Sequence, residues 1–194
     1  MDNKFSILAG IIKDRRSIKP AKMNGKIIPD EWAKDILVLA DWAPTHGRTE
    51  PWRFVVYSGS KVKEFCRQHA ELYKANTNPE NFKQESYDKQ LHNGDLASHI
   101  TIAIMQRGNL PKIPVLEEII ATSAAIQNIL LGATALGIAS FLSTGGLTHH
   151  KVMKDFLQLR DEDVVMGIIY LGYSDDKPEG KRAIPLHEKV KWIK

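Results

Sequence analysis

Residues 116 to 137, LEEIIATSAAIQNILLGATALG, predict one long helix at the centre of the fold. From Ile119 to Thr148 the chain has no Asp, Glu, Lys or Arg, so this helix has no charged face to turn toward solvent. A helix that is apolar all round is buried, either in a protein core or in a membrane. Its alanines and Gly132 leave room for other backbones to approach closely. We therefore expect a central helix that is buried on all sides in protein.

The same uncharged stretch is long enough to span a bilayer, so a membrane helix is the alternative interpretation. Gln127 and Asn128 lie near its start, Gly145 and Gly146 lie near its end, and no dense basic cluster follows it. Membrane spans are usually flanked by such clusters. The sequence therefore favours a helix buried in protein and predicts no membrane partner.

The overall composition is that of an ordinary globular protein, with 194 residues, 43% hydrophobic and 26% charged. One domain over residues 1–194 is expected. The net charge is +4 and the basic residues are scattered, which argues against a nucleic-acid surface. Cys66 is the single cysteine, and the N-terminus lacks the pattern of a signal peptide. A reducing, cytoplasmic location is the expectation.

The elements around the central helix follow from local periodicity and from turn residues. A helix is expected to begin at Pro29 and to stop before Pro44, with Trp32, Ile36, Leu37 and Leu39 on its buried side. Because helices outnumber strands and do not alternate strictly with them, the fold class is α+β around a small sheet. Further helices are expected at 3–14 and 60–73, and strands at 53–57, 100–105 and 164–172.

Two segments predict less regular structure. Residues 74–95, KANTNPENFKQESYDKQLHNGD, are polar and irregular, which is typical of a mobile surface excursion or a lid. The C-terminal residues 178–194 are expected to form an extended arm.

The first polar cluster is Arg15, Arg16 and Ser17, with Lys19 close behind. Guanidinium groups contact phosphate in a bidentate way and a hydroxyl adds a donor, so the cluster could hold a phosphorylated cofactor. The alternative is a solvated basic pair that complements the dipole of the preceding helix.

The second cluster is the loop PTHGRTEPWR at residues 44–53, and the third is LSTGG at residues 142–146. Prolines restrict the second loop, which is rich in hydrogen-bonding groups, although Trp52 itself is more easily explained as a core anchor. Paired glycines in the third let the backbone approach a flat ligand, with Thr148 in the first turn of a following helix. A helix C-cap with a flexible turn is the alternative there.

Other catalytic chemistries find little support in the sequence. No GxSxG, HExxH, GxGxxG or Walker pattern occurs. His149 and His150 are adjacent and point in different directions on a helix, so a metal site is not expected. Glu117 and Glu118 stand where a helix N-terminus favours negative charge anyway. An anion-binding protein without an obvious nucleophile indicates that a cofactor carries the reaction.

Taken in order, five stretches resemble the nitroreductase family of flavin mononucleotide (FMN) enzymes. The resemblance implies a nitroreductase-like fold with a small, mostly antiparallel sheet flanked by helices. It also implies an intertwined homodimer with FMN at the subunit interface and the C-terminal segment reaching over the partner. The stretches are RRSIK (15–19), LADWAPTHGRTEPWRF (39–54), SAAIQNILLGATALGIAS (123–140), FLSTGG (141–146) and GYSDDKPEGKR (172–182) with the following IPLHEKVKW.

The resemblance also implies site residues. Arg15 and Ser17, with Arg16 beside them, match positions that hold the phosphate and ribityl chain, and Lys19 matches a cation near the flavin pyrimidine edge. The loop that reaches FMN from the other subunit is matched by Thr45, His46, Arg48 and Thr49. The segment that lines the ring and its N5 edge is matched by Leu142, Ser143, Thr144 and Gly145. A basic, phosphate-contacting position is matched by Lys181 and Arg182. The third loop lacks the bulky and basic residues common in small family members, which leaves the phosphate more dependent on Arg15 and Arg182.

The function that the resemblance implies is an FMN-dependent oxidoreductase with no protein nucleophile. Hydride would pass from NADH or NADPH through flavin N5 to a nitroaromatic, a quinone or a similar electron-poor acceptor, by a ping-pong route. Two alternatives stay open: a non-enzymatic flavin-binding or sensing protein, and an enzyme of the same fold with another flavin reaction.

Overall fold

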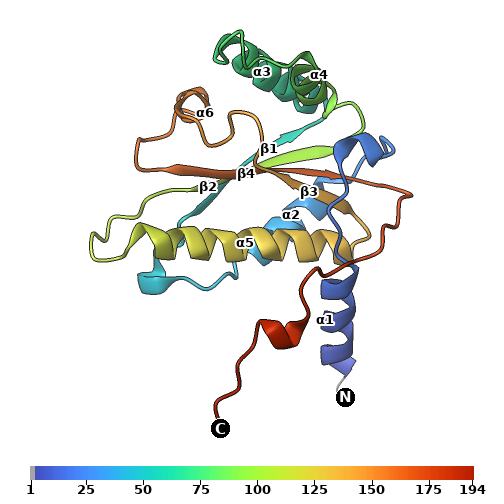
Figure 1. Cartoon of the computed structure of the whole chain (residues 1–194), viewed down its shortest axis with the longest axis vertical. Coiled ribbons are helices and arrows are strands. Elements are labelled where there is room, and N and C mark those ends of the chain that lie inside the picture. Colours follow the sequence, from blue (N-terminus) through green and yellow to red (C-terminus); the bar gives the residue numbers. More distant parts are fainter. Residues whose placement is uncertain (1–2) are drawn as a thin grey trace.

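The computed structural model describes residues 3–194 and is built around one four-stranded sheet in the order β1-β2-β4-β3 (Figure 1). Every neighbouring pair of strands in it is antiparallel. The α+β class and the small, mostly antiparallel sheet are therefore confirmed. The strands are β1 (Trp52–Ser58), β2 (His99–Met105), β3 (Ala139–Ser143) and β4 (Val164–Gly172).

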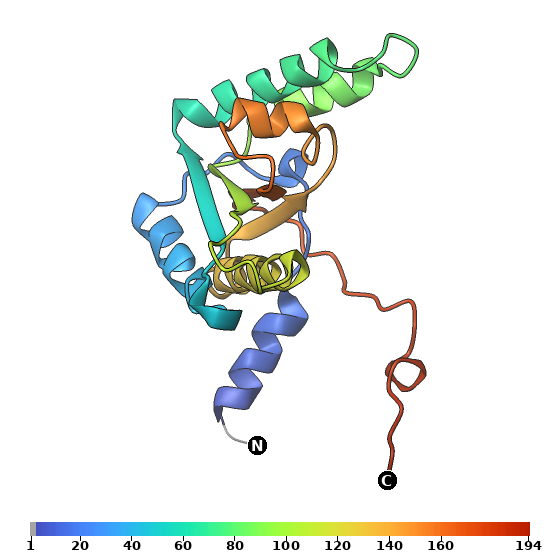
Figure 2. The ribbon, with the colours of Figure 1, turned by 90° about the vertical axis from the view of Figure 1, so that its left-hand side faces the viewer.

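Helices cover both faces of the sheet. The central helix α5 (Val115–Ala135) and α2 (Asp30–Ala40) lie on one side, and α3 (Ser60–Ala75), α4 (Gln84–His92) and α6 (Lys151–Phe156) lie on the other, as both views show (Figures 1 and 2). The apolar run of β4 follows from this arrangement. Ile169 and Leu171 point into the core under α5, while Ile168 and Tyr170 point into the core under α3. A strand that is covered on both faces has no polar side.

The central helix is only partly buried rather than covered on all sides, since Leu116 and Ile120 remain 64% and 58% exposed. It buries nine residues, among them Ala125, Ile129 and Ala133, which have no solvent exposure. By length and composition alone α5 could also cross a bilayer, and 44% of its most apolar window is buried inside the chain. Gly132 shows why small residues are needed, since a Cβ there would come within 3.0 Å of the Leu39 side chain of α2.

Two expectations about the helices were wrong. Trp32 and Leu39 of α2 are 39% and 49% exposed, because the helix turns Ala33, Ile36 and Ala40 toward the core instead. The excursion at 74–95 is not irregular throughout, since α4 forms within it and packs along α3. Phe82 stacks on Tyr73 of α3, and Tyr87 of α4 packs against Phe82 at an angle.

The sequence also missed β3. Residues 142 and 143 end this strand rather than belonging to a loop, and α6 starts at Lys151, after the fully buried Thr148. Beyond β4 the chain leaves the body, and residues 175–194 are exposed throughout (Figure 2). Within the segment 178–194, where an extended arm is expected, the chain forms a short 3-10 turn at Leu186–Glu188. Helix α1 (Asn3–Asp14) also projects from the body (Figure 2).

Candidate functional site

The first and third polar clusters lie side by side at the β3 edge of the sheet. Helix α1 ends at Asp14, and the extended residues after it form a parallel bridge from Ser17 to Ser140. The Ile18 amide donates to the Ser140 carbonyl oxygen over 2.9 Å. Because a parallel pair runs in one direction, Lys19 follows on one segment and Leu142 on the other. The structure thus joins two clusters that are far apart in the sequence.

Three basic side chains in this region are available to bind an anion. Among the described residues, Arg15, Lys19 and Lys181 make no side-chain hydrogen bond or ion pair. Arg15 is half-buried and directly precedes the bridge. A half-buried guanidinium that has no carboxylate partner is well suited to a phosphate.

Arg16 differs from its neighbour, because its guanidinium is occupied by the main chain. Its Nε donates to the Pro178 carbonyl oxygen at 2.8 Å, and its Nη1 donates to the carbonyl oxygens of Lys13 and Arg15. Gly180 packs against the same group, since a Cβ there would stand 2.5 Å from Arg16 Nη2. Arg16 therefore anchors the start of the C-terminal segment, and Lys181 and Arg182 emerge from a point beside it.

The loop after β3 leaves open space next to its glycines. Thr144 and Gly145 are exposed, and a Cβ built at Gly145 would meet no atom within 4 Å. Gly146 has φ +65°, a conformation that side chains other than that of glycine rarely adopt. Thr148 fixes the loop from behind by donating its hydroxyl to the Gly145 carbonyl oxygen at 2.6 Å.

The second cluster is a tightly bonded loop with a strained main chain. The Thr45 hydroxyl lies 3.1 Å from the Thr49 hydroxyl and accepts the Glu50 amide at 3.2 Å. Arg48 and Glu50 both have positive φ, of 54° and 42°. Such positions cost of order 1–3 kcal/mol each and concentrate at functional sites.

One contact ties this loop to the central helix. His46 Nδ1 lies 2.5 Å from Glu117 Oε2 at the start of α5. The Glu117 carboxylate thus has a defined partner besides the helix dipole.

Within one chain the second cluster does not join the other two. It precedes β1, which is one edge of the sheet, whereas Ser17 and Ser143 lie along β3, the opposite edge. Two intervening strands separate these edges, so Arg15 and Ser143 share one region and His46 lies elsewhere in the same chain.

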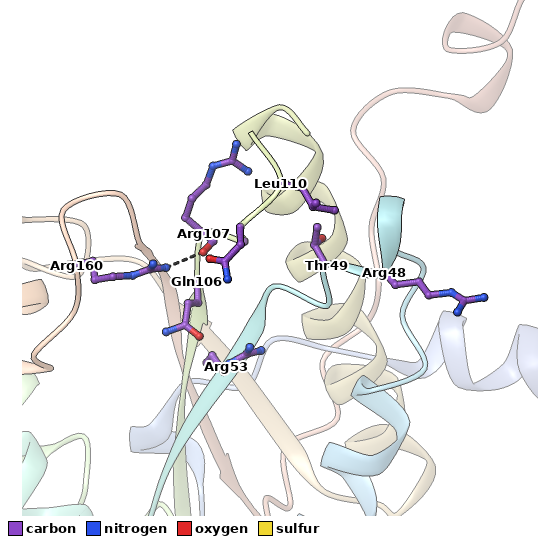
Figure 3. Close-up of a pocket in the computed structure, with 9 residues that line it drawn as sticks. Arg48, Thr49, Arg53, Gln106, Arg107, Leu110 and Arg160 are labelled. Atoms are coloured by element: carbon purple, nitrogen blue, oxygen red, sulfur yellow. Dashed lines mark hydrogen bonds between the residues drawn. The ribbon is translucent and has the colours of Figure 1, made fainter. Parts of the chain in front are cut away.

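A cavity of about 470 Å³ opens beside the second cluster and was not foreseen from the sequence (Figure 3). Figure 3 shows Arg160 donating to the Arg107 carbonyl oxygen, at 2.7 Å, while the Arg48 side chain points away from the cavity. The lining is polar and cationic: Arg48, Thr49, Arg53, Gln106, Arg107, Gly108, Asn109, Leu110 and Arg160.

Buried carboxylates hold two of these arginines. Glu118, 1% exposed, pairs with the Arg107 guanidinium and accepts the Gly108 amide at 3.1 Å. Asp163, also 1% exposed, accepts from Arg160 at 2.8 Å. Burial by itself would raise the pKa of Asp163, but the hydrogen bonds from Arg160 and from main-chain amides outweigh it and hold that pKa below its usual value.

The sequence analysis explained Glu118 by the helix dipole alone, and this was incomplete. A carboxylate at the start of an otherwise apolar helix, with an arginine just after a strand, is the signal that could have indicated a buried ion pair. Removing a charge from water requires such a partner.

Comparisons with known proteins agree with this fold. A Bacillus subtilis (strain 168) protein, YfhC, whose name assigns it provisionally as an NAD(P)H nitroreductase, is 27% identical over 96% of this chain and 94% of its own length. A nitroreductase-like family protein from Bacillus cereus superposes with a TM-score of 0.79 at 26% identity, covering 96% of this chain and 95% of that one. A nitroreductase with bound FMN from Bacteroides fragilis NCTC 9343 superposes with a TM-score of 0.70 at 20% identity. That superposition covers 96% of this chain and 98% of the other.

The family model described as the nitroreductase family matches residues 12–173. That match starts just before Arg15, ends just after β4 and includes all four strands. Because it spans most of the chain, the protein belongs to the nitroreductase family.

Proposed function

We propose that this chain is an FMN-dependent oxidoreductase that takes hydride from NADH or NADPH and passes it to a nitroaromatic, a quinone or a similar electron-poor acceptor. Membership of the nitroreductase family supports the enzyme class, and the name of the B. subtilis relative supports NAD(P)H as the donor. The bound FMN of the B. fragilis structure supports the cofactor. A ping-pong order, in which donor and acceptor use one place in turn, completes the proposal.

The bridge between Ser17 and Ser140 is the observation that carries this function. FMN has a flat ring at one end and a dianionic phosphate at the other. The phosphate needs cations, and the ring needs a nearby segment with small side chains. The bridge holds the free cations Arg15 and Lys19 beside the strand that leads to Gly145. Since a Cβ at Gly145 would meet nothing within 4 Å, there is room for a ring beside that main chain. The residues present fit the cofactor.

The roles of individual residues follow from their chemistry. Arg15 and Ser17 would bind the phosphate and ribityl chain, with Lys181 and Arg182 as further cations on the phosphate. Lys19 would stabilise negative charge at the pyrimidine edge of the ring, which is an electrostatic contribution to the reaction. Amides and hydroxyls of residues 143–145 would donate toward N5. The bound FMN would supply the hydride acceptor, so no side chain need act as a nucleophile.

In a homodimer, the second cluster would contribute to the flavin site of the other subunit. Thr45, His46, Arg48 and Thr49 lie at the opposite sheet edge from Ser143, so they would reach the flavin of the other subunit. The chain also exposes large apolar side chains that a partner could cover, with Trp42 82%, Trp192 82% and Ile193 85% exposed. In a homodimer such side chains would be covered by the partner.

A visible spectrum tests the function directly. Purified protein reconstituted with FMN should show the bands of oxidised flavin, and these bands should bleach when NADH or NADPH is added without oxygen. The ligand released on denaturation should be FMN. Protein that takes up no FMN contradicts the proposal, whereas tight FMN binding without any bleaching would support the flavin-binding or sensing alternative.

A further inference from the structure

Helices α3 and α4 bring two buried polar side chains to the back of the loop that follows β3. His69 of α3 is 2% exposed and Gln90 of α4 is 8% exposed. Neither ring nitrogen of His69 has a hydrogen-bond partner among residues 3–194. Gln90 Oε1 also lacks a partner among these residues. The amide end of Gln90 is already occupied, since Nε2 donates to the Ser86 carbonyl oxygen at 3.1 Å. The oxygen end therefore faces away from its own helix.

Both side chains are aimed at Gly146. A Cβ built on that glycine would stand 2.9 Å from Gln90 Oε1 and 3.3 Å from His69 Nε2. The main chain of the loop thus lies directly against these two atoms. Gly146 also has φ +65°, so both the space and the backbone conformation demand glycine there.

The His69 ring is held in place and uncharged. Phe65 stacks on it, with ring centroids 5.7 Å apart and an interplanar angle of 28°. Burial lowers the pKa of His69 to about 4, so at neutral pH one ring nitrogen carries a proton and the other accepts. The pair therefore offers one donor and two acceptors to the main chain beside it.

Buried polar atoms without partners are uncommon, because each one loses its hydrogen bonds to water. Of the three such atoms here, Gln90 Oε1 and His69 Nε2, on two different helices, lie against one turn of main chain. The same turn belongs to the segment that we assign to the flavin ring. Gln90 Oε1 and the unprotonated ring nitrogen of His69 are both able to accept a hydrogen bond from a main-chain amide.

We propose that His69 and Gln90 are positioning residues that set the path of the main chain at residues 143–146 and thereby tune the flavin without touching it. This inference rests on the proposed function, since it assigns these residues a role in the same site. It also gives α3 and α4 a role beyond packing, because the segment that carries them would control the donors offered to the ring.

The first test uses the protein without added cofactor. Gln90→Leu removes the acceptor at similar size, His69→Phe removes both nitrogens, and His69→Gln keeps a donor and an acceptor. Gln84→Leu, on the exposed start of α4, is the matched control. Hydrogen–deuterium exchange of the peptide covering 143–148 should rise at least fivefold in Gln90→Leu and His69→Phe. Exchange should stay within twofold of wild type in Gln84→Leu and should be largely restored in His69→Gln.

The second test uses the protein loaded with FMN. The rate constant for flavin reduction by NAD(P)H, measured anaerobically by stopped flow, should change at least threefold in Gln90→Leu, while the FMN dissociation constant stays within threefold of wild type. If exchange at 143–148 and the reduction rate both match wild type, and only resistance to urea falls, the side chains are structural and the inference is overturned.

The two proposals fail in different ways. If wild-type protein takes up no FMN, the proposed function is contradicted. The exchange experiment then still reports whether His69 and Gln90 set the main-chain path of the loop. Wild-type protein that is reduced normally, with variants that behave like Gln84→Leu, removes only the positioning role.

Discussion

Ser17 and Ser140 form an isolated parallel bridge, with the neighbouring Ile18 amide donating to the Ser140 carbonyl oxygen over 2.9 Å. This bridge places the segment that follows α1 along the edge of the sheet, next to the strand that leads into the glycine loop. Arg15 lies two residues before Ser17 and has no carboxylate partner among the described residues. The geometry makes Arg15, rather than Arg16, the free guanidinium of the pair.

Arg15→Ala should weaken FMN binding, because it removes the charge-assisted contact that we propose between Arg15 and the phosphate. The expected loss is about 1–3 kcal/mol, or roughly 5- to 150-fold in the dissociation constant. Quenching of FMN fluorescence on binding measures it. Arg67→Ala, an exposed arginine on α3, is the control and should bind FMN as wild type does. An unchanged dissociation constant in Arg15→Ala would take Arg15 out of the site.

Trp42→Asp should dissociate the proposed homodimer. The Trp42 side chain is 82% exposed and lines a cavity of about 320 Å³ together with Leu8, Leu39 and Leu131. A buried aromatic anchor at an interface is worth about 2–4 kcal/mol, so the dimer dissociation constant should rise at least 30-fold. Sedimentation velocity over a concentration series measures this change. Asn81→Asp, on an exposed loop, should leave the dimer intact, and a monomeric wild type would contradict the dimer itself.

Glu118→Ala should be strongly destabilising, since it leaves the Arg107 guanidinium without its carboxylate. Removing one partner of a buried ion pair costs about 3–5 kcal/mol, which urea unfolding would show. The double variant Glu118→Leu with Arg107→Met should recover a large part of that loss, because no charge then remains unpaired. A double variant that is as unstable as Glu118→Ala would indicate that the hydrogen bond to the Gly108 amide matters more than the charges.

Stability should fall in mild acid because of His69. Burial lowers its pKa to about 4 in the folded chain, against the usual value near 6.5 when unfolded. The unfolded state therefore binds the proton first, so the contribution of His69 is fully present above pH 6.5 and is lost as pH falls toward 4. The full effect is about 3 kcal/mol. Urea unfolding at several pH values should show this slope in wild type and a weaker one in His69→Phe, while an equal slope in both would assign it to other groups.

Cys66 should be inert in the folded protein. Its side chain is fully buried, and burial raises the pKa of the thiol to about 12. The thiolate is the reactive form, so an aromatic disulfide reagent should react with Cys66 only as fast as the protein opens. The rate should rise by orders of magnitude in denaturant, and fast labelling of folded protein would show that α3 opens readily.

Local patterns predicted most of the elements. The apolar run at 164–172 matches β4 at both ends, because a strand covered on both faces has to be continuously apolar. Strand β3 was missed because its apolar character does not distinguish it from the helix before it. The apolar character of α5 continues into β3, and the three residues 136–138 between the two elements contain a single turn residue, Gly137, with φ +69°. A short apolar run fits a helix or a strand equally well.

The exposed faces show a second limit of local patterns. Trp32 and Leu39 carry the apolar signal of a buried helix face, yet they are half-exposed in the single chain. The sequence records that these side chains are apolar, but it does not record whether the chain itself or a partner covers them.

Sequence alone determined the helices and strands that repeat an apolar period, the basic and glycine-rich stretches, and the resemblance that named the family. Tertiary structure alone decided that Ser17 would lie against Ser140, that Glu118 would neutralise Arg107, and that His69 and Gln90 would meet Gly146. The physical reason is the range of the interactions. Periodicity and turn chemistry act over a few residues, whereas these contacts join distant segments that meet only after the sheet and its two covering layers have packed.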